Sequence, residues 1–142
     1  MAYASVQDMV DRFGDLELIQ ITDRNRDGEI DRDVAQTALD DATAEIDAYL
    51  GRFARPFADT PPILVRLCCD IARYRLSAAN GVLITDEIRN RYKIDVLDLL
   101  RAIAKGDVQL GVDDAGGEIA AADNGVLFVN GQNKVFGRDN RN

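Results

Sequence analysis

Three segments of the chain place apolar residues three or four positions apart, and this spacing constrains the fold more than any other feature. The segments run over residues 33–53, 60–77 and 85–105. Such spacing puts the apolar side chains on one face of an α-helix, and each apolar face needs another helix to cover it. The sequence therefore predicts an all-α protein, a small helical bundle with three long helices.

Signals for helix ends lie around these segments. Ser5, with Asp8 three positions later and Gly14 after the last apolar residue, predicts a short capped helix. Residues 16–21 form a second short apolar turn or helix. Thr60 predicts the cap of the second long helix, and Pro61 and Pro62 fit its first turn, where a missing N–H costs nothing. We expect one or two short helices before the three long ones.

The composition changes after Gly106, where glycine becomes frequent. Two Asn-Gly pairs flank the β-prone residues 126–129, so this region can form a β-hairpin, although an isolated hairpin is barely stable in water. We divide the chain into a helical bundle, residues 1–106, and an extended C-terminal arm, residues 107–142. The arm has no core of its own, so we expect its aromatic side chains to be exposed and to contact a partner. The predicted interaction residues of the arm are Phe128, Phe136 and Arg138.

Several classes of enzyme are excluded by composition. The chain contains no histidine, so imidazole-based nucleophiles, general bases and metal sites cannot be built from it. It also lacks the glycine-rich phosphate loops and the nucleophile elbow. We expect no enzymatic activity. We also expect a protein made in the cytoplasm, because no signal peptide and no membrane-spanning run of apolar residues is present.

Cys68 and Cys69 are adjacent in the chain. Neighbouring residues on a helix point in different directions, so this pair cannot close an ordinary disulfide or form half of a C-x-x-C zinc site. We expect both cysteines to be reduced and buried as small apolar residues.

The charge is unevenly distributed along the chain. Residues 1–54 carry a net charge of −8, residues 55–106 carry +3 and residues 107–142 carry −3. The acidic total argues against tight nonspecific binding of nucleic acid. Opposite charge on two parts of one domain is compatible with head-to-tail packing of copies in a ring. The alternative is that these charges only form a solvated surface.

The most distinctive local motif is an acidic loop that begins at Asp23 and has Gly28 at its sixth position. Its first nine positions match a calcium-binding loop, but Val34 stands at position twelve, where such a loop carries a bidentate glutamate. Two interpretations stay open. The loop is either a structural turn in which Asp31 or Asp33 caps the next helix, or a weak calcium site with the candidate ligands Asp23, Asn25, Asp27, Glu29 and Asp31.

Asp70 and Arg73 stand three positions apart and can form an ion pair on the surface of a helix. Nearby guanidinium groups favour the ionised carboxylate, so we interpret this pair as structural or inter-subunit rather than catalytic. Tyr74 and Tyr92 are expected as core or interface aromatics rather than ligand contacts.

Four segments carry a family resemblance: MAYASVQDMVDRFG at 1–14, ELIQITD at 17–23, AEIDAYL at 44–50 and CDIARYRL at 69–76. In this order they resemble the Mu-like phage and prophage neck proteins, over about residues 1–111. The terminal VFGRD at 135–139 resembles the tail of the same family.

The resemblance implies a head-tail connector of the adaptor type, located in the neck of the virion and assembled in the host cytoplasm. Such a protein would form a homo-oligomeric ring of twelve copies beneath the portal protein. It would bind the portal and the next neck or tail-terminator protein, and would meet DNA only as it passes through the channel. No cofactor is required and no membrane is involved. The competing hypotheses are a calcium-responsive binding module built on Asp23–Asp31, and a regulatory subunit of an enzyme.

Overall fold

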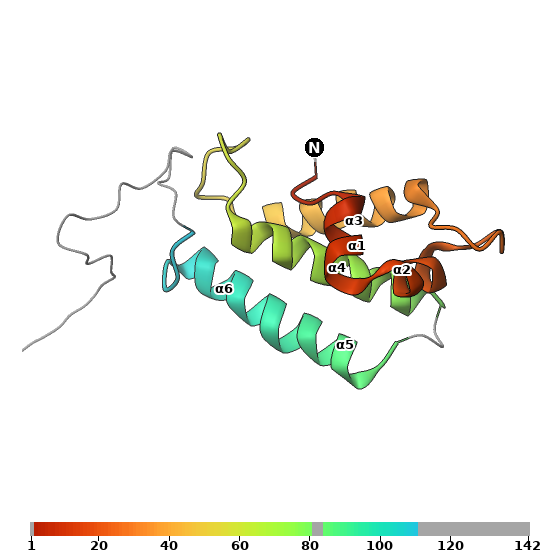
Figure 1. Ribbon diagram of the computed structural model, residues 1–142. Helices are drawn as coiled ribbons and strands as arrows, with labels where there is room; N and C mark the ends of the chain where they lie inside the picture. Colours follow the sequence, from red (N-terminus) through yellow and green to blue (C-terminus); the bar gives the residue numbers. More distant parts are fainter. Residues whose placement is uncertain (1, 81–83, 111–142) are drawn as a thin grey trace, which may run out of the picture.

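A computed structural model describes residues 2–80 and 84–110 (Figure 1). Its helices in chain order are α1 (Val6–Phe13), α2 (Asp15–Thr22), α3 (Arg32–Asp47), α4 (Pro62–Asn80), α5 (Asp86–Asn90), the π-helical segment η1 (Arg91–Val96) and α6 (Leu97–Lys105). No strand occurs within the described ranges, and the all-α fold class is confirmed there. The expected hairpin around residues 126–129 lies outside them.

Helix α1 begins and ends where the sequence predicts. The Ser5 hydroxyl accepts the N–H of Asp8 at 3.1 Å, and the Asp8 carboxylate accepts the N–H of Ser5 at 2.8 Å. This reciprocal pair is a capping box. The chain then turns at Gly14, whose φ of 90° suits glycine, and α2 follows directly. Both predicted short helices are therefore present.

Helix α3 is shorter than the apolar spacing predicts. It ends at Asp47, whereas the pattern continues to Phe53. The N–H groups of Tyr49 and Leu50 bond to carbonyls only three residues back, at 2.9 and 3.1 Å, and the Arg55 guanidinium donates to the Leu50 carbonyl at 2.9 Å. Leu50 and Phe53 are nevertheless buried. The pattern identified core residues correctly, but the helical conformation predicted for them is wrong.

Helix α4 is the central element of the fold. It contacts α1, α2, α3, α5 and η1, and Figure 1 shows it between α3 and the α5–α6 segment. It starts at Pro62, one residue later than a cap at Thr60 predicts. Its fully buried residues are Leu64, Leu67, Cys68, Cys69, Ile71, Ala72 and Ser77. Because α4 is covered on several sides, it is the helix against which the others are positioned.

Both cysteines are free and buried in α4, which confirms the prediction for them. Burial raises the pKa of the Cys69 thiol to about 12 and also raises the pKa of Cys68. Both side chains therefore stay protonated at neutral pH and act as apolar packing groups.

The segments α5, η1 and α6 form one continuous helix, residues 86–105. The Thr85 hydroxyl accepts the N–H of Ile88 at 3.2 Å, and Gly106, with φ of 88°, ends the helix by donating to the Ile103 carbonyl at 3.1 Å. The predicted ends of this third long helix are confirmed. The π-helical stretch in its middle was not predicted, and it changes which side chains face α4.

The core extends slightly beyond the predicted domain boundary, because Leu110 still packs into the main hydrophobic cluster. The division of the chain into residues 1–106 and 107–142 stays a prediction, since the structure describes nothing after residue 110. Within the described helices, none is long and apolar enough to cross a membrane.

Candidate functional site

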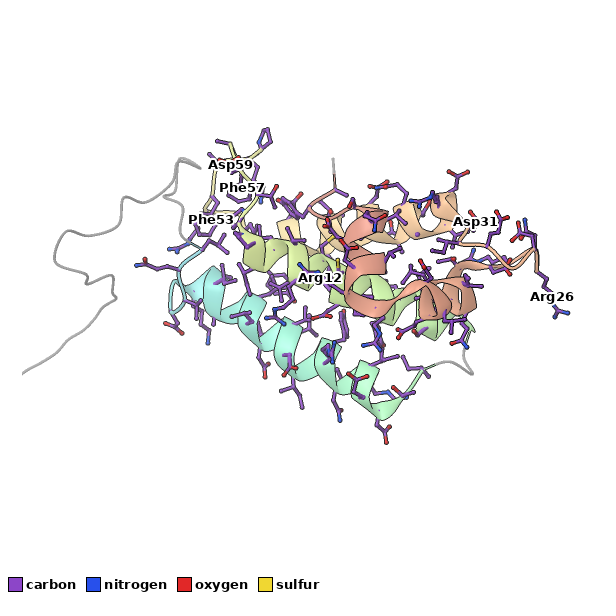
Figure 2. The ribbon with its side chains drawn as sticks, viewed as in Figure 1. Arg12, Arg26, Asp31, Phe53, Phe57 and Asp59 are labelled. Carbon is purple, nitrogen blue, oxygen red and sulfur yellow. The ribbon has the colours of Figure 1, made fainter. Side chains whose placement is uncertain are left out.

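The acidic loop lies at one end of the molecule, where Arg26 and Asp31 are labelled in Figure 2. Its conformation is set by the first aspartate. The Asp23 carboxylate accepts the N–H of Asp27 at 3.1 Å and the N–H of Gly28 at 2.8 Å. These bonds lower the pKa of Asp23, chiefly through Gly28. Gly28 has a φ of 80°, a backbone conformation that favours glycine.

Asp31 connects this loop to helix α3. Its carboxylate accepts the N–H of Val34 at 3.2 Å and so caps the helix. Its own N–H donates to the hydroxyl of Thr22 at 3.1 Å, and that buried hydroxyl donates to the Leu18 carbonyl at 2.7 Å. The loop is thus closed by its own hydrogen bonds, and of the two predicted capping residues, Asp31 and Asp33, it is Asp31 that caps α3.

The calcium hypothesis stays a prediction. The Asp27 carboxylate accepts the N–H of Glu29 at 3.0 Å. The carboxylates of Asp23, Asp27 and Asp31 therefore all accept hydrogen bonds from backbone N–H groups. Within the described part of the chain, no three His, Cys, Asp or Glu side chains gather so that they could hold a metal ion. Asn25 and Glu29 are exposed on the same loop.

A network of ion pairs joins α2, α4, α5 and η1. The Arg73 guanidinium binds Glu17 through two nitrogens, one of them at 3.1 Å, and also approaches Glu87 at 3.6 Å. It lies 4.7 Å from the centre of the Phe13 ring. Glu87 in turn pairs with Arg91. Arg73 is 12% exposed and Glu17 is 27% exposed, so their pair lies mostly out of solvent and helps to fix α2 on α4.

The predicted pairing of Asp70 with Arg73 is wrong. Asp70 pairs with Arg66 at 3.4 Å and with Arg91 at 3.7 Å, while Arg73 is occupied by partners on α2 and α5. The expected effect on the carboxylate is also wrong. The side chain of Asp70 is only 5% exposed, and burial raises its pKa despite the nearby guanidiniums. Desolvation therefore exceeds the attraction of the positive charges.

Tyr74 and Tyr92 stack face to face, with ring centres 4.1 Å apart and planes 4° apart. The Tyr92 hydroxyl donates to Glu45 at 2.6 Å, and Glu45 also pairs with Arg75. Burial and this carboxylate raise the pKa of Tyr92 to about 12. The expectation that both tyrosines pack against protein is thus confirmed, and their cluster connects η1 to α3 across α4.

Sequence reasoning did not find the acidic partners Glu17, Glu45 and Glu87. Only the pairing of Glu87 with Arg91 had a local signal, because the two stand four positions apart. The predicted interaction residues Phe128, Phe136 and Arg138 lie outside the described residues. The clusters described above hold helices together through ion pairs, hydrogen bonds and ring stacking.

The described residues define a small all-α protein whose surface is charged and whose polar clusters hold helices together. Comparison with known proteins identifies the family of this chain. The chain matches the family described as "Bacteriophage Mu, Gp36" over residues 3–129, and it belongs to this family. It is 33% identical to the Mu-like prophage FluMu protein gp36 of Haemophilus influenzae over 138 residues, 96% of this chain and 94% of the relative.

A second relative is Gene product J of Escherichia phage Mu. It is 35% identical over 115 residues, which cover 80% of this chain and 79% of the relative. The resemblance to Mu-like phage and prophage proteins is therefore confirmed, and it extends over the bundle and into the C-terminal segment.

Proposed function

We propose that this protein is a structural component of a Mu-like phage particle and acts as a head-tail connector of the adaptor type. Copies form a ring of twelve beneath the portal protein and join the DNA-filled head to the next neck or tail-terminator protein. The observation that carries this proposal is membership of a phage Mu family over most of the chain. The role is non-enzymatic and requires no cofactor.

The distribution of charge supports a ring. A ring of identical copies needs two different surfaces that meet head to tail. Residues 1–54, which contain α1 to α3, carry a net charge of −8, whereas residues 55–106 carry +3. On α3, Asp33, Asp40 and Asp41 are exposed. These acidic side chains can meet the more basic part of a neighbouring copy.

Exposed apolar side chains offer contact points on two different elements. Leu16 at the start of α2 is 77% exposed, and Ile94 in η1 is 58% exposed. Burying them against a neighbour would remove apolar surface from water and favour association. Single exposed apolar residues are common on monomers. Leu16 and Ile94 therefore support a ring only together with the uneven charge distribution.

A phage or induced prophage with a stop codon at Tyr3 tests the proposal. We expect electron microscopy of the lysate to show heads that are filled with or leaking DNA, together with separate tails. The intact protein supplied from a plasmid should restore tailed particles. Normal tailed particles in the absence of the protein would contradict the connector role.

The arm supplies a second test. The double variant Phe136→Ala and Arg138→Ala should keep the helicity of the bundle but fail to enter particles. Arg141→Ala, a change in the same segment, serves as the control and should be incorporated normally. Normal incorporation of the double variant would show that these two residues are not needed for assembly.

A further inference from the structure

Helix α5 is attached to the bundle differently from its neighbours, and it lies at the edge of the molecule (Figure 1). Of the helices that the structure describes, it alone places no residue in the main hydrophobic cluster. Its one buried side chain, Ile88, lies outside that cluster. Further along the same continuous helix, Val96, Leu100 and Ile103 all belong to the cluster. The core that holds the later turns of this helix therefore does not hold its first turns.

Two ion pairs join these first turns to α4. Glu87 approaches the Arg73 guanidinium at 3.6 Å, and Arg91, the first residue of η1, approaches Asp70 at 3.7 Å. Glu87 is 55% exposed and Arg91 is 38% exposed, so water and dissolved ions reach one partner of each pair. Ion pairs that are open to solvent hold helices together only weakly and are screened by salt.

The buried carboxylate of Asp70 makes the second pair weaker still. Its side chain is 5% exposed, so the packing that brings it close to Arg91 also removes it from water. Burial raises the pKa of Asp70 in spite of Arg91 and Arg66, because the lost hydration outweighs the attraction of the guanidinium groups. Movement of α5 away from α4 would return water to this carboxylate, and the regained hydration offsets part of the cost of breaking the pair.

The residue that follows Arg91 is anchored on two other helices. The ring of Tyr92 stacks on Tyr74 of α4, and its hydroxyl donates to Glu45 of α3 at 2.6 Å. The boundary between weakly and firmly held residues thus falls inside η1. There the Leu97 N–H bonds to the Tyr92 carbonyl, five residues back. Helices bend at π-helical turns of this kind, so η1 can act as a pivot.

We propose that residues 86–91 form a strap that opens away from α4 while the rest of the bundle stays folded. The strap pivots in η1, next to the anchored Tyr92. Opening breaks both ion pairs with α4 and exposes Ile88 and the carboxylate of Asp70. A rise in ionic strength weakens the pairs and shifts the balance toward the open strap. This property belongs to the single chain and does not depend on the connector role.

Thiol labelling of the full-length protein measures the opening. Ile88→Cys places a thiol on the strap, and Leu100→Cys, on the same continuous helix but in the core, is the matched control. Each variant reacts with iodoacetamide, which is uncharged, and mass spectrometry follows the label at each cysteine. We expect position 88 to react at least about tenfold faster than position 100, because the strap opens without global unfolding. The buried Cys68 and Cys69 report global unfolding in the same samples.

Ionic strength and charge variants test the role of the ion pairs. Raising the salt concentration from about 0.05 M to about 1 M should speed labelling at position 88 about twofold to fivefold and leave position 100 unchanged. Arg91→Gln, combined with Ile88→Cys, should speed labelling at low salt by a similar factor and reduce the response to salt. Arg101→Gln is the control for charge, since Arg101 pairs with the exposed Asp98 in α6, and it should change neither rate.

Hydrogen exchange of the unsubstituted protein is a second measurement. The released turns are too short to stay helical alone, so the amides of residues 89–91 should exchange faster than those of residues 97–105, and more so at high salt.

Equal labelling rates at positions 88 and 100 would overturn the proposal, because they would show that α5 leaves α4 only when the whole bundle unfolds. Fast labelling at position 88 that responds neither to salt nor to Arg91→Gln would also contradict it, since the ion pairs would then not hold the strap. Circular dichroism of each variant confirms that the bundle is folded. The stop-codon experiment reads particle assembly instead, so either proposal can fail without the other.

Discussion

At the scale of single residues, Asp31 is the point where the acidic loop is fixed to helix α3. Its carboxylate caps the helix through Val34, and its N–H reaches the buried hydroxyl of Thr22. Sequence reasoning could predict this cap, because aspartate is a preferred residue immediately before a helix. It could not predict the bond to Thr22, which depends on how α2 and α3 meet.

Asp31→Ala should lower the free energy of unfolding by about 1 kcal/mol, because the N-terminal donors of α3 lose their side-chain acceptor. For a domain of this size, that corresponds to a fall in Tm of about 4 °C. Thermal unfolding followed by circular dichroism measures the change. Asp33→Ala is the control, since Asp33 is exposed and is not the capping residue. An equal fall for both variants would contradict the cap assignment.

Asp23 should make stability depend on pH. Its pKa is lowered in the folded protein from a reference value of 3.8, so the ionised carboxylate stabilises the fold. This contribution is complete above the unfolded pKa and is lost as the pH falls through the lower, folded pKa. The difference in urea midpoint between the protein and Asp23→Ala should therefore be constant near neutral pH and shrink below about pH 4. A difference that grows on acidification would contradict this account.

Calcium should have little effect on stability if the loop is only a structural turn. The carboxylates of Asp23, Asp27 and Asp31 already accept backbone N–H groups, so we expect equal Tm values in EGTA and in millimolar calcium. A ligand that binds only the folded state would raise the Tm by mass action. A clear rise that disappears in Asp23→Ala would instead support the calcium-responsive module.

At the scale of elements, Arg73 holds α2 on α4 and α5. It pairs with Glu17 and Glu87 and covers the ring of Phe13. Glu17 and Arg73 are 56 positions apart, and no local pattern links them. The sequence therefore predicted that α2 exists but not what positions it. The same limit applies to the pairing of Asp70 with Arg91, whereas its other partner, Arg66, stands four positions away on the same helix.

Arg73→Ala should destabilise the protein by about 1–3 kcal/mol, because it removes the two-nitrogen contact with Glu17 and the packing against Phe13. Hydrogen exchange should become faster in α2 than in α4, since α2 loses the contact that holds it. Arg89→Ala is the control, because Arg89 pairs only with the exposed Asp86 among the described residues, and such pairs contribute about 0–1 kcal/mol. Uniform acceleration across all helices would contradict the local role of Arg73.

Helix boundaries were predictable where a local signal exists. The Ser5 capping box, Pro62 and Gly106 each mark an end that the structure confirms. The end of α3 has no such signal. The chain leaves the helix after Asp47 while Leu50 and Phe53 continue to fill the core, and the Arg55 guanidinium donates to the carbonyls of Asp47 and Leu50. Tertiary contacts decide this boundary, so apolar spacing alone extended the helix too far.

At the scale of the whole molecule, the bundle has two different ends. One carries the acidic loop, and the described chain ends at Leu110 near the other (Figure 1). Together with the acidic N-terminal half, this polarity suits copies that pack head to tail. The family was recognisable from four sequence segments, whereas the packing of α3 against α4 became known only from the structure.

The central claim is that this protein forms part of the neck between head and tail. Cryo-electron microscopy of the neck of purified particles, combined with mass spectrometry of the same particles, tests it most directly. We expect a ring of helical bundles beneath the portal into which residues 2–80 and 84–110 fit as described. A neck fully accounted for by other proteins, in particles from which this chain is absent, would contradict the claim.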